Sequence, residues 1–169
     1  FARNFGVPLH VRSSFMPETG TWIQDQEKNM EDAIVSAVTH DTSEVKFTLE
    51  RVPDKPGVAA KIFRALSDEN LNVDMIVQNV STDGLTDISF TVPADERLKV
   101  IEVLEDASFD SGSMGYQSNE NVGRVSVVGA GMKSNPGIAA TMFETLAAEN
   151  INIQMISTSE IKISLIIDD

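Results

Sequence analysis

Apolar and polar residues alternate strictly from Glu44 to Glu50, and Val45, Phe47 and Leu49 supply the apolar positions. A period of two residues is typical of a half-buried β-strand. After Pro53 the spacing lengthens, and apolar residues recur at helical intervals over residues 57–69 (Val58, Ala59, Ile62, Phe63 and Leu66). The pattern therefore predicts a strand followed by an amphipathic helix.

The alternation returns twice after this helix. It predicts a strand over residues 71–77 and another over 88–92, separated by a turn at Asp83-Gly84. Pro93 opens a second predicted helix, whose Leu98, Ile101 and Leu104 we expect to face the core, and a weak strand around Tyr116 closes the unit. This order of elements, β-α-β-β-α-β, predicts an α+β, ferredoxin-like module over residues 42–118.

A second copy of this pattern follows at a shift of 80 residues. Residues 56–76 align without a gap with residues 136–156, and 11 of the 21 positions are identical. The second copy continues with apolar strands over 151–156 and 161–167, after a strand over 122–128. It lacks a second helix and a last strand, and the strand predicted over 34–39 can replace that strand. We therefore expect module one to be inserted in module two, which comprises residues 30–41 plus 119–169 and is truncated at its C-terminal end.

Charge and composition exclude several classes of function. The formal net charge is −13 and no basic cluster interrupts it, which argues against nucleic acid or a membrane as partner. The chain has no cysteine and two histidines 30 residues apart, so neither disulfides nor a histidine metal site are expected. No apolar run reaches the roughly 18 residues of a membrane span, and no signal peptide is visible, so we expect a cytoplasmic protein. The first residue, Phe1, indicates a fragment of a longer protein.

The link between the first strand and its helix carries the candidate chemistry. Backbone amides at the start of a helix can hold a carboxylate, and Asp54 or Asp74 can hold an ammonium group. Together they match a free amino acid. The alternative, favoured by spacing alone, is that Asp54 only caps the helix and that Pro56-Gly57 only turns the chain.

No catalytic constellation is visible. The segment Gly129-x-Gly131-x-Lys133-Ser134 lacks the spacing of a phosphate-binding loop, and we interpret it as a tight turn. Neither His10 nor His40 lies in a module motif, and the chain has no Gly-x-Ser-x-Gly sequence. These observations disfavour the hypothesis that the chain itself transfers phosphate from ATP.

Three segments carry a resemblance to a known family. Residues 54–60 (Asp-Lys-Pro-Gly-Val-Ala-Ala), 72–81 (Asn-Val-Asp-Met-Ile-Val-Gln-Asn-Val-Ser) and 156–164 (Ile-Ser-Thr-Ser-Glu-Ile-Lys-Ile-Ser) resemble the tandem ACT domains of aspartate kinases. The likeness covers residues 30–169. Residues 9–15 (Leu-His-Val-Arg-Ser-Ser-Phe) are similar to the end of that family's amino-acid-kinase domain, so residues 1–29 are expected to be its tail and a linker.

The resemblance implies a regulatory function and its partners. In this family the ACT pair senses threonine and lysine, end products of amino-acid biosynthesis, and imposes feedback inhibition on the attached kinase. It implies a homodimer, or association with a kinase-containing chain, through packing of ACT modules with effectors at the seam. Some members make a separate regulatory subunit from an internal start, for which Met30 stands at the right place. ATP and magnesium belong to the kinase domain, so no cofactor is expected in this stretch.

The effector contacts carried over by the resemblance fall in both repeats. In the first they are Asp54, Lys55, Pro56, Gly57, Val58, Ala59, Asn72, Val73, Asp74 and Gln78, and in the second Ile138, Ala139, Asn152, Ile153, Ser159 and Glu160. We take Asn135 and Gln154 as the counterparts of Asp54 and Asp74. Because the second repeat then lacks both carboxylates, the first is expected to dominate affinity, with threonine as its ligand and lysine held elsewhere on the dimer.

Two alternatives to this regulatory hypothesis stay open. One is a structural dimerisation module that binds no effector. The other is an ACT regulatory region of a different amino-acid biosynthetic enzyme.

Overall fold

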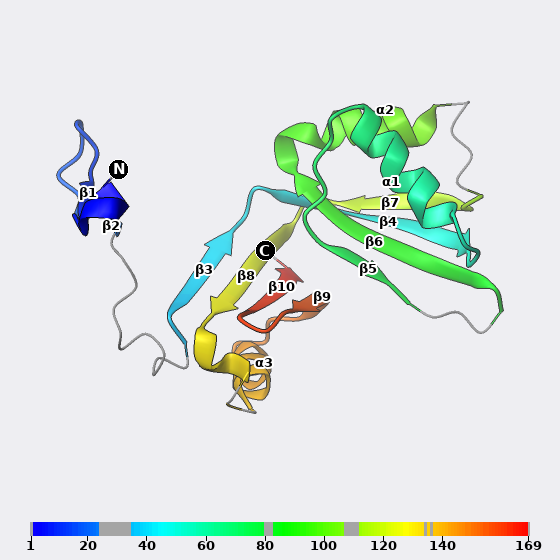
Figure 1. Ribbon diagram of the computed structural model, residues 1–169. Helices are drawn as coiled ribbons and strands as arrows, with labels where there is room; N and C mark the ends of the chain where they lie inside the picture. Colours follow the sequence, from blue (N-terminus) through cyan, green and yellow to red (C-terminus); the bar gives the residue numbers. More distant parts are fainter. Residues whose placement is uncertain are drawn as a thin grey trace.

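The structure is a computed structural model that describes residues 2–23, 35–79, 83–106, 112–133, 135 and 137–168. Its strands form one two-stranded and two four-stranded sheets (Figure 1). At the N-terminus a short 3-10 helix, Ala2–Phe5, precedes a hairpin of β1 (Leu9–Val11) and β2 (Thr21–Ile23). The His10 ring of β1 stacks on Trp22 of β2 with centroids 4.0 Å apart.

Module one has the predicted element order. Its elements are β4 (Glu44–Pro53), α1 (Val58–Asp68), β5 (Ile76–Gln78), β6 (Leu85–Pro93), a 3-10 turn (Ala94–Glu96), α2 (Arg97–Glu105) and β7 (Gly115–Asn119). The strands lie in the order β5-β6-β4-β7, and every neighbouring pair is antiparallel. This is the ferredoxin-like α+β arrangement, so the predicted fold class is confirmed.

Both helices of module one pack on one face of its sheet (Figure 1). Phe47 and Phe90 lie fully buried side by side on β4 and β6, and Ile62 and Leu66 of α1 are buried with them. The expectation that Leu98 faces the core is wrong, because its side chain is 67% exposed and Val100 is buried instead. Ile101 and Leu104, the other two residues expected to face the core, do pack against it.

Module two repeats this architecture with one substitution. It contains β8 (Val122–Val128), a 3-10 turn (Ala130–Lys133), α3 (Ile138–Ala148), β9 (Ile153–Thr158) and β10 (Lys162–Asp168). The strand order is β3-β8-β10-β9, in which β3 (Ala37–Asp41) pairs antiparallel with β8. β3 thus takes the place that β7 has in module one, and the predicted insertion of module one in module two is confirmed. Ile34, the first residue of the predicted strand, lies outside the described residues.

Module two has a thinner helical layer than module one. In the described part of the chain, α3 is the one helix on its sheet, where module one has both α1 and α2. Its core contains Met142 from α3, Val127 from β8, and Ile163 and Leu165 from β10. No described helix of the chain is long and apolar enough to cross a lipid bilayer.

Candidate functional site

The start of α1 is built on a glycine in the left-handed region. Gly57 has φ 94° and occupies the capping position, and no side chain caps the helix. A Cβ at this position would meet nothing within 4 Å, so the space beside Gly57 is open. The first amides of a helix have no partner within the helix, and the helix dipole favours an anion there. This end of α1 is therefore suited to a carboxylate.

Asp54 does not cap α1, so the alternative interpretation of this residue is wrong. Its Oδ1 accepts a hydrogen bond from Gln78 Nε2 at 3.4 Å, and its backbone amide donates to the Gly84 carbonyl at 2.9 Å. The structure thus brings Asp54 and Gln78 together beside the N-terminus of α1. Both were predicted as effector contacts. Of the other predicted contacts, Lys55 and Pro56 lie in the link before α1, and Val58 and Ala59 are its first two residues.

The remaining predicted residues of the first repeat, Asn72, Val73 and Asp74, lie at the opposite end of the sheet. Gln78 pairs with Ile88 of β6, whereas Asp74 donates its amide to Thr91, close to Pro93, which pairs with Glu44. The idea that Asp54 and Asp74 frame one crevice is therefore wrong. Because α1 carries the chain back along the sheet, the segment leading into β5 is level with the start of β4, while Asp54 follows the end of β4.

Asn72 and Asp74 have other partners at that end. The Asn72 amide donates to Glu96 Oε2 at 3.1 Å. The Asp74 carboxylate accepts a hydrogen bond from Arg124 Nη1 of module two.

A crevice with a volume of about 270 Å³ lies at the N-terminus of α3 in the second repeat. It is lined by Met132, Asn135, Gly137, Ile138, Ala139, Thr158, Ser159, Glu160 and Ile163. Four predicted residues, Ile138, Ala139, Ser159 and Glu160, therefore meet there. Asn152 and Ile153 do not, because Ile153 pairs with Ile167 at the far end of β9, whereas Thr158 pairs with Ile163.

The walls of this crevice differ in chemistry. Gly137 has φ 109° and begins α3 without a side-chain cap, so this helix start is suited to a carboxylate in the same way as that of α1. Glu160 supplies a carboxylate, while Met132, Ile138 and Ile163 supply apolar surface. Ser159 is fixed in place, because its amide donates to the Lys162 carbonyl at 2.7 Å. The crevice can therefore hold both charged groups of an amino acid and a short side chain.

Sequence reasoning missed part of this lining, namely Met132, Gly137, Thr158 and Ile163. The repeat gave a usable signal, because positions flanking the helix start in one module recur 80 residues later. The same shift corrects one correspondence. Asn135 matches Lys55, and the position that matches Asp54 is Ser134, which lies outside the described residues.

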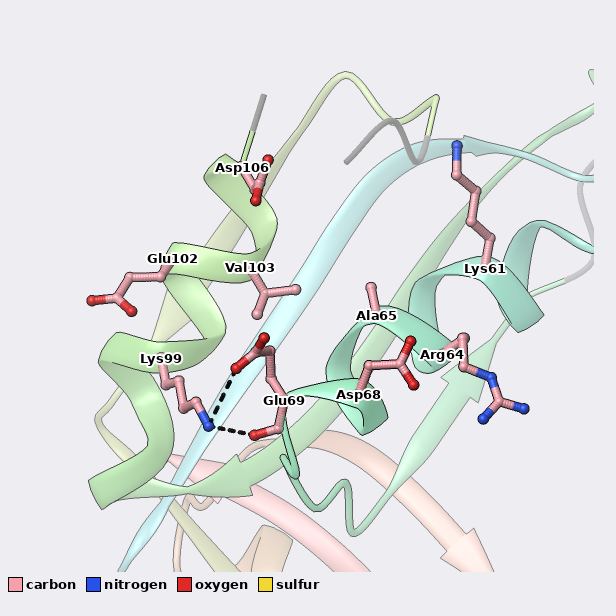
Figure 2. A pocket seen from close by; sticks show the side chains of 9 residues that line it. All are labelled: Lys61, Arg64, Ala65, Asp68, Glu69, Lys99, Glu102, Val103 and Asp106. Atoms are coloured by element: carbon pink, nitrogen blue, oxygen red, sulfur yellow. Dashed lines mark hydrogen bonds and ion pairs between the residues drawn. The ribbon is translucent and has the colours of Figure 1, made fainter. Parts of the chain in front are cut away.

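The structure has two further hollows, of which one lies away from the predicted sites and the other adjoins the start of α3. A groove of about 520 Å³ between α1 and α2 is lined by Lys61, Arg64, Ala65, Asp68, Glu69, Lys99, Glu102, Val103 and Asp106 (Figure 2). Its side chains carry both signs of charge, and Lys99 Nζ pairs with Glu69 Oε2 at 3.5 Å across it. It contains no predicted effector contact.

Among the described residues, no group of acidic or histidine side chains is arranged to hold a metal ion.

The second hollow is an apolar groove of about 560 Å³ in module two. It runs between α3 and the strands β3 and β8, and its lining includes Val38, Val125, Val127 and Met142. In module one the equivalent region of the sheet is covered by α2, whose Val100 is fully buried.

Comparison with known proteins agrees with the fold and with the repeat. A family model of the ACT domain matches residues 50–107 and 125–169. The aspartokinase of Mycolicibacterium smegmatis is 45% identical over 173 aligned residues, which cover 100% of this chain but 41% of that protein. The chain thus spans about two fifths of the length of this curated relative.

Solved structures give the same result. A crystal structure of aspartokinase alpha and beta subunits has 46% identity and a TM-score of 0.73, covering 79% of this chain and 88% of that one. The ligand-free regulatory subunit of aspartate kinase from Thermus thermophilus has 37% identity and a TM-score of 0.75, with coverage of 80% and 89%. The chain therefore belongs to the ACT domain family, and within it to the regulatory regions of aspartokinases.

Proposed function

We propose that this chain binds an end-product amino acid, threonine or lysine, and thereby mediates feedback inhibition of an aspartokinase. The observation that supports this proposal most directly is the crevice at the start of α3. It combines an uncapped helix N-terminus with the carboxylate of Glu160 and with apolar walls. An amino-acid ligand has a carboxylate, an ammonium group and a side chain to match these three features.

The first repeat offers a related arrangement. There the uncapped start of α1 lies next to Asp54 and Gln78. A ligand carboxylate would face the helix amides, and its ammonium group would approach Asp54. Phosphate transfer from ATP to aspartate would be carried out by the kinase domain of the same protein or of a partner chain, and ATP and magnesium would bind there.

We further propose that the ACT modules associate with those of a second chain, as a homodimer or with a kinase-containing chain. β5 and β9 are edge strands of their sheets, and each exposes an isoleucine at the same position of the repeat. Ile76 is 51% exposed and Ile156 45%. Exposed apolar edge strands favour pairing with another chain, and a symmetric pair buries the same strand from both copies.

Calorimetric titration of the chain with threonine and with lysine, separately, tests the binding proposal. We expect saturable heat for at least one of the two. For a ligand that uses the second-repeat crevice, Glu160→Gln should weaken binding by about 1.5–3 kcal/mol, or roughly 10- to 100-fold in Kd. Glu144→Gln, on the exposed side of α3, is the matched control and should leave Kd unchanged.

Two results would contradict the proposal. Absence of heat with both amino acids would favour the structural dimerisation module. An equal loss of affinity in both glutamate variants would show that general negative charge, not the crevice, attracts the ligand. Light scattering with and without each amino acid tests association, and a monomer under every condition would overturn that part.

A further inference from the structure

The described strands pass between the two modules at two adjacent places. β3 of module two leads into β4 of module one through Thr42 and Ser43, and β7 returns to β8 through Glu120 and Asn121. β3 pairs with β8, and β4 pairs with β7, so the two crossings lie side by side in one two-stranded ribbon. Short paired crossings of this kind can absorb a change of angle between the bodies they join, as hinge residues do.

Arg124 lies directly at these crossings. It is the third residue of β8, and its side chain is 20% exposed. Nη2 contacts Asp41 Oδ2 of β3 at 3.2 Å, and Nη1 contacts Glu44 Oε1 of β4 at 2.8 Å. Nη1 also pairs with Asp74, which precedes β5. One guanidinium in module two thus holds the last residue before the crossing, the first residue after it, and a second segment of module one.

The four side chains do not balance in charge. Three carboxylates surround one guanidinium, which leaves a surplus of two negative charges when all are ionised. Glu44 is 4% exposed, and its Oε2 is buried without a hydrogen-bond partner among the described residues. Burial raises the pKa of the Glu44 carboxyl, a hydrogen bond with Thr91 and the attraction of Arg124 oppose this rise, and Asp74 raises the pKa further. A buried ion group of this kind contributes little net stability, but removing its central charge leaves unpaired charges behind.

The repeat explains how the modules meet. At the 80-residue shift Arg124 is the counterpart of Glu44, and Met155 is the counterpart of Met75. Glu44 contacts Arg124, and the two methionines share a buried cluster with Val122 and Ile166. Contacts between equivalent residues are the mark of a two-fold interface. The modules therefore face each other as two copies of one protein would, and this is a defined interface with one preferred orientation.

A second polar contact flanks the shared cluster. Lys46 Nζ of β4 donates to Gln154 Oε1 of β9 at 2.9 Å, and Gln154 in turn donates to Asp168. This chain of contacts contains one positive and one negative charge, so it is balanced where the Arg124 group is not. Replacing Lys46 therefore serves as a comparison for replacing Arg124.

We propose that residues 42–43 and 120–121 form a hinge between the two modules, and that Arg124 latches this hinge by binding Asp41, Glu44 and Asp74. With the latch intact the modules keep one relative orientation. Without it, the two crossings, the small buried cluster and the Lys46–Gln154 contact are left to hold them, and the angle between the modules varies. The hinge and its latch are independent of which effector binds and of whether one binds.

The absence of cysteine allows a direct measurement of this angle. Glu102→Cys in α2 and Glu144→Cys in α3 place one exposed label on each module of an otherwise cysteine-free chain. Electron-spin distance measurement on the doubly labelled chain should give a single narrow distribution. In the Arg124→Met background we expect the width of the distribution to at least double. Arg64→Met, which removes an exposed arginine of α1, is the matched control and should leave the width unchanged.

Asp74→Asn provides a milder variant in case Arg124→Met does not fold, which circular dichroism would reveal. It removes one contact that spans the modules, and it should broaden the distribution less than the arginine variant does. Lys46→Met removes the cation of the balanced contact, and it should broaden the distance distribution less than Arg124→Met does. The proposed role of Arg124 is wrong if the folded Arg124→Met variant keeps the narrow distance distribution. If that variant does not fold, a narrow distribution in Asp74→Asn has the same meaning. The proposed role is also wrong if Lys46→Met broadens the distribution as much as the Arg124 change does.

Discussion

The buried carboxyl of Glu44 should make the stability of this protein fall with pH in a specific window. Its pKa is raised mainly by burial, with a further contribution from Asp74, above the ordinary value of 4.5. Between 4.5 and the raised pKa, the folded chain holds a proton at Glu44 that the unfolded chain has lost. The contribution of this group to stability is therefore full below the ordinary value and is lost as the pH rises through the raised one.

The magnitude follows from proton linkage. One site can change the free energy of unfolding by at most about 1.4 kcal/mol per pH unit, and each unit of pKa difference is worth the same amount. Glu44→Gln removes the proton exchange but keeps the shape and a hydrogen-bonding oxygen for Arg124. The free energy of unfolding of the wild type minus that of Glu44→Gln should therefore decrease from pH 4 to pH 7, with a slope no steeper than about 1.4 kcal/mol per pH unit.

Urea unfolding at half-unit pH steps, followed by circular dichroism, measures both curves. Glu102→Gln removes an exposed carboxylate and is the control. Asp41 does not confuse the result: hydrogen bonds from Ser43 lower its pKa below 3.8, so its opposite contribution is lost below the pH range studied. Wild-type and Glu44→Gln curves that run parallel across the range would refute the reasoning, because Glu44 would then be ionised equally in both states.

Three further predictions concern folding and the sites, and urea or thermal unfolding measures each. Ile62→Ala, in the fully buried core, should lower the free energy of unfolding by about 2–5 kcal/mol. Leu98→Ala, at a 67% exposed position, should lower it by less than about 0.5 kcal/mol. Similar losses for the two variants would mean that Leu98 faces the core, as the sequence pattern predicts. Asn70 has φ 57° at the end of α1, so Asn70→Ala should cost about 1 kcal/mol and Asn70→Gly should not; equal losses would contradict this. Gly57→Val should cost roughly 1–3 kcal/mol, because φ 94° strains a β-branched residue, and should also weaken amino-acid binding in the fraction that folds; normal binding there would show that Gly57 has only a backbone role.

Much of the fold could be predicted from local pattern. The period-two alternation placed the start of β4, and the helical spacing placed α1 within one residue at each end. Strand counting placed β3 beside β8, because a ferredoxin-like sheet needs a fourth strand and one apolar segment was unassigned. These inferences succeed because each depends on the chain's own periodicity and on a short list of allowed connections.

The candidate sites were harder to predict, because they depend on the register of the strands. Asp54 and Asp74 both follow an expected ligand-binding pattern in the sequence. In the structure, however, α1 carries the chain back to the level where β4 starts, so the two residues are separated by the length of β4. Arg124 was not singled out at all. The repeat contained one signal for it, since an arginine stands in the second copy where the first has a glutamate. A reversal of charge at equivalent positions is what two facing repeats need in order to attract each other.

The positions of the two sites and of the hinge along the strands connect these observations. β4 begins at the hinge with Glu44 and ends at Pro53, next to the uncapped start of α1. β8 likewise begins beside Arg124 and ends at Val128, close to the crevice at the start of α3. Each proposed amino-acid site is thus joined to the hinge by a single strand at the centre of its sheet.

This geometry sets a condition that an effector must meet. A ligand can shift the hinge only if its affinity differs between the two hinge positions. If the two are coupled, threonine or lysine at saturation should narrow the distance distribution of the labelled Arg124→Met chain. The Arg124→Met change should also weaken binding of that amino acid, by the factor by which it lowers the population of the orientation that binds. Binding that is unchanged by Arg124→Met, with a distribution that stays broad at saturation, would show that the sites and the hinge act independently.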